Sequence, residues 1–279
     1  MDKSGVRTAI QAGHEEARGI IARQAVALGF LPPAWFALSP DDEDAAGLLL
    51  SMPYRLYEDF PIGHGIVDAY YLASHAAWQA AHVLCRALEA LGIAAEPMRD
   101  VSLKVTALEA GVGRFGHNQL VCHETHGSLI ALQAVRVVGV PLPDGLRKRT
   151  RQEAALPGCD ACGRCQRACP TGALRDGGFD AGRCLRTWML AGQPVPETMR
   201  EAMGRRLLGC EECRRACPHT PKERVAPPSA LVVACNLQSL CNAEQRKALM
   251  PYFAQIVGAN NARESRWAQQ AAVCADNAR

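Results

Sequence analysis

Eight cysteines lie between Cys159 and Cys217, and their spacing constrains this chain more than any other feature of its sequence. The chain has 279 residues and 13 cysteines, so the other five are scattered. Its first residues open no apolar stretch of the kind that a signal peptide needs, and no run of about 18 apolar residues could cross a membrane. We therefore expect a cytoplasmic protein without membrane contact. In reducing surroundings, clustered cysteines bind metal or redox cofactors rather than form disulfides.

The eight cysteines form two motifs. The first, from Cys159 to Pro170, reads C-x2-C-x2-C-x3-C-P, and the second, from Cys210 to Pro218, reads C-x2-C-x3-C-P. The first spacing is that of bacterial ferredoxins, in which three cysteines wrap one cubane and the fourth binds the other. Each iron corner of a cubane takes one soft thiolate. The sequence therefore predicts two [4Fe–4S] clusters, whereas structural zinc favours pairs of C-x2-C and gains nothing from the proline.

The motifs also predict which cysteines share a cluster. For cluster 1 we expect the ligands Cys159, Cys162, Cys165 and Cys217. For cluster 2 we expect Cys169, Cys184, Cys210 and Cys213, with Cys184 replacing the middle cysteine that the second motif lacks. The remaining five cysteines are expected to be small buried residues: Cys85, Cys122, Cys235, Cys241 and Cys274.

Positive charge gathers around the motifs. The formal net charge is only +3, but residues 147–224 contain sixteen Lys or Arg and nine Asp or Glu. An oxidised cubane with four thiolates carries about −2, so two clusters bring roughly −4, which these arginines offset. Nucleic-acid binding is the alternative interpretation of the same excess.

Hydrophobic periodicity predicts an α+β chain with three domains. We expect helices over about 7–28, 65–91 and 102–110, strands over 48–52, 119–123 and 129–140, and a helical segment at the end. The predicted domains are an α/β domain over 1–150, a ferredoxin-type double-cluster domain over 151–225, and a helical segment over 226–279.

Residues 111–116 match the pattern G-x-G-x-x-G of dinucleotide-binding proteins. That fingerprint requires a strand before the glycines and a helix after them. Here the predicted order is reversed, so we expect tight turns or a close backbone approach rather than a nucleotide site.

The order of these features resembles the epoxyqueuosine reductase family, whose relatives include the reductive dehalogenases. Residues 48–54 resemble the family's early strand ending in a tyrosine, and residues 102–120 resemble its helix–glycine–strand signature. Residues 125–128 and 140–143 stand at family-like positions, both cysteine motifs match, and Arg266-Trp267 resembles the arginine–tryptophan helix that follows in the family.

The resemblance implies a nitroreductase-like, cobalamin-type α/β domain before the clusters, and a reductive reaction in which the clusters pass electrons to cobalt. It implies an acidic proton donor, for which Asp100 is the candidate, with an N-cap of the next helix as the alternative role. By position, the candidate cobalamin-pocket residues are Lys104, Gly113, Gly116, Asn118 and Ser128. The implied partners are an electron donor such as a ferredoxin or flavodoxin and a small-molecule or modified-nucleoside substrate.

The sequence departs from the family in three ways. Residues 67–71 (Val-Asp-Ala-Tyr-Tyr) replace the family's Asp-Tyr-His motif, His117 replaces its lysine, and the chain has no room for its tRNA-binding repeats. These departures count against epoxyqueuosine as substrate and against tRNA binding. We therefore expect an iron–sulfur reductase of unknown substrate. An electron carrier without catalysis and an RNA-binding module are the alternatives, and the roughly 150 residues before Cys159 favour an enzyme.

Overall fold

The computed structural model describes residues 3–38, 44–146, 153, 155–175 and 178–278, and it divides the chain into two compact units. Unit 1 consists of residues 1–53, 76–114 and 130–155, and unit 2 of residues 54–75, 115–129 and 156–279. Each unit is therefore assembled from three separated stretches. The three linear domains stay a prediction, and their boundary at 150 lies outside the described residues.

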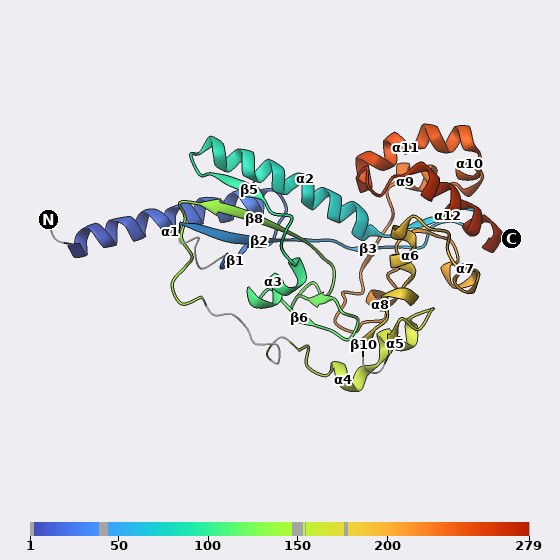
Figure 1. Ribbon diagram of the computed structural model, residues 1–279, viewed down its shortest axis with the longest axis horizontal. Coiled ribbons are helices and arrows are strands. Elements are labelled where there is room, and N and C mark those ends of the chain that lie inside the picture. Colours follow the sequence, from blue (N-terminus) through green and yellow to red (C-terminus); the bar gives the residue numbers. More distant parts are fainter. Residues whose placement is uncertain (1–2, 39–43, 147–152, 154, 176–177, 279) are drawn as a thin grey trace. The chain divides into compact units, whose positions relative to one another are not determined.

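Unit 1 is built on a four-stranded antiparallel sheet with the strand order β1-β2-β8-β5 (Figure 1). The strands are β1 (Ala34–Phe36), β2 (Ala45–Pro53), β5 (Ala95–Pro97) and β8 (Ile130–Val138). β2 and β8 pair over nine residues, from Ala45 opposite Val138 to Pro53 opposite Ile130. The first seven residues of β2 are buried, as its run of Leu and Ala requires of a central strand.

Three helices belong wholly or partly to unit 1. They are α1 (Lys3–Ala27), α2 (Ala69–Ala90) and α3 (Leu103–Glu109), which packs on β2 and β8. Gly111 ends α3 with a φ of +75°, its N–H bonding the carbonyl of Leu108. The glycine pattern at 111–116 thus follows a helix, as predicted, which is the reverse of the dinucleotide fingerprint.

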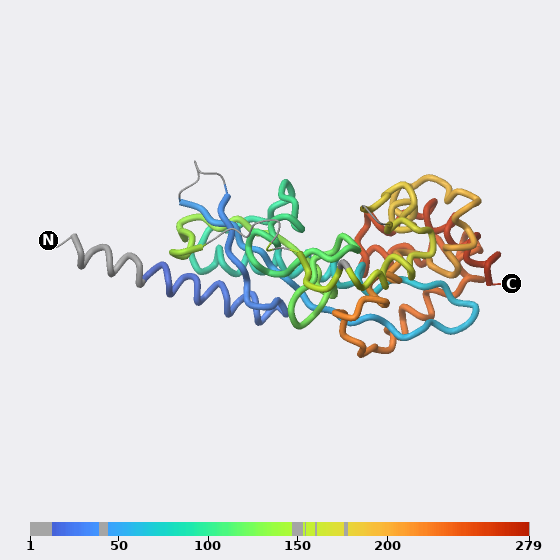
Figure 2. Tube along the Cα trace, turned by 90° about the horizontal axis from the view of Figure 1, so that it is seen from below, coloured from blue at the N-terminus to red at the C-terminus, as the bar shows by residue number. Residues whose placement is uncertain are grey.

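Unit 2 holds short strands that join distant parts of the chain. β3 (Leu56–Tyr57) pairs in parallel with β12 (Arg224–Val225), and β4 (Ile66–Val67) with β11 (Arg206–Leu208). In Figure 2 the blue-to-cyan stretch that holds β3 and the orange stretch that holds β12 run side by side. The other small pairs are β6 (Arg114–Phe115) with β7 (Val121–Cys122) and β9 (Leu174–Arg175) with β10 (Gly178–Phe179).

The rest of unit 2 is helical. Its helices are α4 (Cys159–Cys162), α5 (Arg164–Ala168), the 3-10 turn η1 (Ala181–Arg183), α6 (Leu185–Ala191), α7 (Glu197–Met203), α8 (Glu212–Arg215), α9 (Ser229–Ala234), α10 (Leu237–Cys241), α11 (Ala243–Val257) and α12 (Glu264–Asn277). Their shared core includes Leu185, Met189, Phe253 and Trp267. Among the described residues, none of the helices combines the length and the apolar character needed to cross a bilayer.

Two predicted elements differ from the structure. The helix expected from residue 65 begins at Ala69, because Ile66 and Val67 form β4 and the N–H of Ile66 bonds the carbonyl of Arg205. The strand expected over 119–123 shortens to β7, because residues 116–120 form a turn. In that turn Gln119 has a φ of +58°, and Asn118 Oδ1 accepts a bond of 3.3 Å from the N–H of Leu120.

Candidate metal centre

A cavity of about 110 Å³ in unit 2 gathers four of the eight motif cysteines. These four are the ones expected to bind cluster 1, namely Cys159, Cys162, Cys165 and Cys217. Three come from α4 and α5, and Cys217 follows α8, so the cavity joins the two motifs. The crossing of Cys217 to the first motif's cysteines is thus a property of the fold.

Two glycines shape the first motif. Gly158 and Gly163 precede α4 and α5 with φ values of +72° and +58°, a region that side chains with a β-carbon rarely adopt. They turn the chain before and after α4, so that Cys159, Cys162 and Cys165 all line one cavity. The N–H of His117 donates to Cys159 Sγ at 3.2 Å, which ties the glycine segment to the same wall.

The electrostatics of the cavity favour a metal-bound thiolate set. Burial raises the pKa of Cys165, and the neighbouring Cys159 and Cys217 raise it further. Thiolates at this spacing repel one another unless a cation lies between them, and iron supplies that charge. Four thiolates in one cavity are the soft donor set that the iron corners of a cubane take.

The second predicted set also comes together. Burial raises the pKa of Cys213 to about 11, opposed by Arg214, and the nearby thiols of Cys165, Cys184 and Cys169 add to the rise. Of these three thiols, Cys165 belongs to the first predicted set and the other two to the second. Burial likewise raises the pKa of Cys210 to about 12, with Cys213 contributing. The ligand assignment itself stays a prediction, but each predicted set has members close enough to interact.

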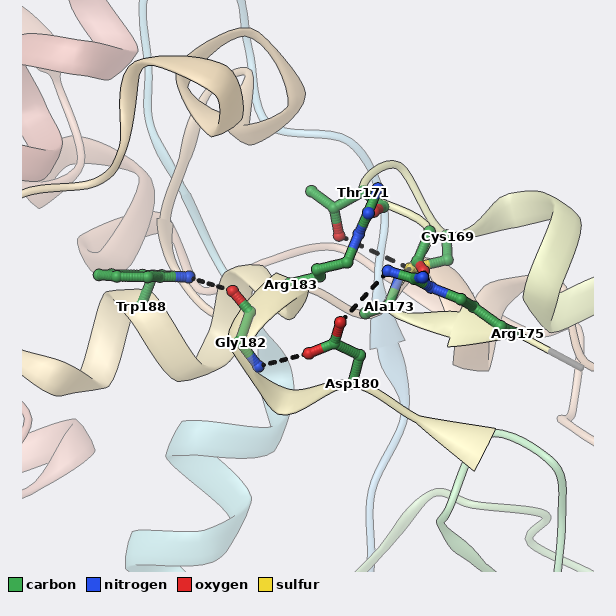
Figure 3. A network of polar contacts seen from close by, with 9 residues as sticks. Cys169, Thr171, Ala173, Arg175, Asp180, Gly182, Arg183 and Trp188 are labelled. Carbon is green, nitrogen blue, oxygen red and sulfur yellow. Dashed lines mark hydrogen bonds and ion pairs between the residues drawn. The ribbon is translucent and has the colours of Figure 1, made fainter. Parts of the chain in front are cut away.

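A network of polar contacts holds the segment that links Cys169 to Cys184 (Figure 3). The N–H of Ala173 donates to Cys169 Sγ at 3.2 Å, and such backbone donors lower the pKa of Cys169 in spite of its burial. Asp180 bonds the N–H of Gly182 at 3.0 Å. The remaining contacts run from Arg183 to the Thr171 carbonyl (2.9 Å), from Arg175 to Asp180 (3.2 Å) and from Trp188 to the Gly182 carbonyl (2.6 Å). Together they fix Cys184 at the start of α6.

Two arginines lie beside the second set. Arg214, next to Cys213, is 5% exposed, and its guanidinium carbon stands 4.8 Å from the centre of the Tyr70 ring. Arg206 is half-buried and bonds Glu212 at 2.6 Å, and in spite of that burial Cys210 and Glu212 raise its pKa. That arginines offset the charge of the clusters stays a prediction.

The candidate cobalamin residues divide between the units. Gly116, Asn118 and Ser128 line the cysteine cavity of unit 2, whereas Lys104 and Gly113 belong to unit 1. Cofactor pockets usually measure ~300–1,000 Å³, so a cavity of about 110 Å³ is too small to enclose a whole corrinoid. The cavity therefore gives these three residues no complete corrinoid pocket, and the cobalamin roles of all five residues stay predictions.

Asp100 is exposed in a bend of unit 1 before α3. The alternative role predicted for it, an N-cap, is wrong because Ser102 occupies the N-cap position. Its role as proton donor stays a prediction.

Comparison with known proteins decides what this centre is. Residues 158–220 match the family described as 4Fe-4S double cluster binding domain. Two [4Fe–4S] clusters are therefore the cofactors of this centre, as the cysteine motifs predict.

The wider chain has curated relatives. It is 36% identical over 136 residues to an epoxyqueuosine reductase of Burkholderia pseudomallei, covering 47% of this chain and 32% of that protein. It is 35% identical over 115 residues to the epoxyqueuosine reductase of Escherichia coli, covering 40% of this chain and 28% of that protein. The chain thus matches about a third of the length of these relatives.

Solved structures share the fold. An epoxyqueuosine reductase from Bacillus subtilis superposes with a TM-score of 0.75 at 17% identity, covering 95% of this chain and 82% of that one. A crystal structure of an epoxyqueuosine reductase with a modified tRNA-Tyr stem loop superposes with a TM-score of 0.74 at 17% identity, with the same coverage of both chains. The chain is thus similar to epoxyqueuosine reductases over part of their length and shares a mixed α and β fold with the solved ones.

Two features of the double-cluster domain's surroundings escaped sequence reasoning. Cys122, expected to be a small buried residue, is indeed buried but lines the cysteine cavity. The same expectation is wrong for Cys241, which is exposed. A group of tyrosines also packs around arginines of the cysteine region, with Arg186 donating to Tyr71 Oη at 3.1 Å. The signals were the cysteine two residues after the helix–glycine–strand signature and the arginine two residues after Cys184.

Proposed function

We propose that this chain is an iron–sulfur reductase of the epoxyqueuosine reductase type, which passes electrons through its two clusters to a corrinoid for a reductive step. The supporting observation is the cavity in which cysteines of both motifs meet. In the proposal, Cys159, Cys162, Cys165 and Cys217 hold cluster 1, and Cys169, Cys184, Cys210 and Cys213 hold cluster 2. A bound pair of [4Fe–4S] clusters accepts and releases single electrons.

The chain's own residues prepare that transfer. The N–H groups of His117 and Ala173 donate to cysteine sulfurs, and hydrogen bonds to ligand sulfur raise a cluster's reduction potential. Buried Arg214 adds positive charge beside the second set. These groups favour the reduced state, which carries one more negative charge.

The acceptor and the substrate enter the proposal through the resemblance. A corrinoid is the proposed acceptor, Asp100 the proposed proton donor, and Lys104 and Gly113 remain the proposed corrinoid contacts outside the cavity. A solved neighbour binds an epoxyqueuosine-modified tRNA stem loop, so a modified nucleoside is the proposed substrate class. A ferredoxin or flavodoxin is the proposed electron donor.

Anaerobic purification with and without added cobalamin tests the proposal, read by iron content, visible absorption and EPR. We expect about eight irons per chain, as two four-iron clusters require. We also expect a change in the cobalt signal when the clusters are reduced. Eight irons without a cobalt change would replace the reductase with an electron carrier, and fewer than about four would contradict the cluster assignment.

A matched pair of variants tests the ligands. Cys213→Ala removes a proposed ligand of cluster 2, and we expect it to lose iron. Cys85→Ala, at a buried cysteine of α2 in unit 1 that belongs to neither motif, should keep about eight irons.

A further inference from the structure

We propose that Cys122 is a reserve ligand of cluster 1, which binds iron in place of Cys217 when that thiolate is lost. The inference rests on the proposed ligand assignment and extends it. Cys122 is the fifth cysteine of the cavity, and it reaches it from β7 rather than from either motif.

Cys122 lies close to two of the proposed ligands, Cys217 and Cys159. The residue is 7% exposed and lines the same cavity as both of them. A thiol that binds iron loses its proton, because iron stabilises the thiolate.

The Cys122 thiol is also weakly engaged. Among the described residues, the hydrogen bond found for it runs to the carbonyl oxygen of His123 at 4.0 Å, the long limit for sulfur. Turning the thiol away from that carbonyl therefore costs little, and no strong bond ties it to β7.

A second side chain of the same cavity wall lacks a hydrogen-bond partner that a bound cluster could supply. Ser128 lines the cavity and is 4% exposed, and its buried Oγ has no hydrogen-bond partner among the described residues. A buried hydroxyl without a partner costs roughly 1–3 kcal/mol, and cluster sulfurs accept hydrogen bonds. The wall formed by residues 116–128 thus faces the cluster with both a free donor and a fifth thiol.

The exchange of ligands balances without an oxidant. The bond from iron to Cys217 Sγ breaks and a bond from iron to Cys122 Sγ forms. The proton of the Cys122 thiol passes to the departing Cys217 thiolate, and no electron moves. Where residue 217 carries no thiol, the proton leaves to solvent.

Four variants test the proposal after anaerobic reconstitution with ferrous iron and sulfide: Cys217→Ala, Cys217→Ala with Cys122→Ser, Cys217→Ala with Cys85→Ser, and Cys122→Ser alone. We expect Cys217→Ala to retain about eight irons and a four-iron EPR signal. The double variant with Cys122→Ser should fall to about seven irons and show the signal of a three-iron cluster, because one corner has lost its thiolate. The pairing with Cys85→Ser controls for losing any buried cysteine and should match Cys217→Ala.

Two results would overturn the reserve role. One is the same iron content and EPR signal in Cys217→Ala and in its double variant with Cys122→Ser. The other is loss of a cluster in Cys122→Ser alone, which would make Cys122 an obligatory ligand. Circular dichroism checks each fold, and Cys122→Ala repeats the comparison without a polar atom in β7. A wild-type chain with fewer than about four irons would instead contradict the proposed function.

Discussion

At the scale of single residues, the spacing of the cysteines predicts more than any propensity does. It foresees that Cys217 meets the first motif, because three thiols at short intervals leave one cubane corner for a distant partner. Cys122 could not be placed in the same way. No spacing rule connects it to the motifs, and only the turn at 116–120 carries its strand to the cavity.

Arg214 should set the potential of cluster 2. It is buried beside Cys213, where low dielectric strengthens its attraction for negative charge. Arg214→Gln should lower the midpoint potential of one cluster by on the order of tens of millivolts, measured by EPR-monitored redox titration.

Arg164 provides the control for that measurement, because it also neighbours a motif cysteine but is exposed to solvent. Arg164→Gln should shift the potential much less, since water screens an exposed charge. Equal shifts in the two variants would show that burial of Arg214 does not matter.

At the scale of elements, the sequence predicts the helices and strands that have a regular hydrophobic periodicity. It does not predict the short strands that form only by pairing with a distant segment. The long helices α1 and α2, the buried strand β2 and the helices after residue 226 all follow from hydrophobic spacing. The two-residue strands β3 and β4 could not be predicted. They exist only because residues 205–225 run beside them.

The turn between β7 and β8 depends on Gly127. It has a φ of +54°, its N–H and carbonyl both bond His123, and a β-carbon would overlap the carbonyl oxygen of His219. Gly127→Ala should therefore destabilise the protein by at least about 3 kcal/mol in urea unfolding and lower its iron content.

Gly192 serves as the control, because an alanine there incurs only the conformational part of the free-energy cost expected for Gly127→Ala. Its φ is +72°, but a β-carbon there would meet nothing within 4 Å. Gly192→Ala should cost only about 1–2 kcal/mol and leave the iron content unchanged. If the two alanine variants unfold at the same urea concentration, the contact with His219 is unimportant.

Trp267 anchors α12 in the core of unit 2. It is fully buried, its ring centre lies 3.8 Å from that of Phe253, and its indole N–H donates to the Asn261 carbonyl at 2.9 Å. Trp267→Ala should cost about 3–5 kcal/mol in urea unfolding. Trp267→Phe keeps an aromatic ring and should cost about half as much or less, so equal losses would contradict a packing role.

At the scale of the whole molecule, the two units differ in what stabilises them. The sheet of unit 1 pairs β2 with β8 over its full length and buries a continuous aliphatic strand. Around the cysteines of unit 2, the helices are four or five residues long, too short to be stable without tertiary support. The sequence could not predict that each unit is built from three separated stretches, because that division depends on contacts between residues far apart in the chain.

Removal of the clusters should therefore loosen the chain unevenly. After anaerobic chelation of iron, we expect hydrogen exchange to speed up in residues 115–129 and 156–220, while β2 and β8 stay protected. Mass spectrometry of peptides from both units would measure this. Uniform loss of protection would show that unit 1 depends on the clusters for its stability.

The cavity is lined by motif cysteines from Cys159 to Cys217, and this separation along the chain has a consequence for biosynthesis. At 5–20 residues per second, a ribosome needs roughly 3–12 seconds to proceed from one of these cysteines to the other. During that interval the first motif emerges with its thiols exposed and its last partner not yet made. The segment that carries Cys122 has by then already left the ribosomal exit tunnel. The nascent chain therefore has the Cys122 thiol available beside the first three thiols before translation reaches Cys217.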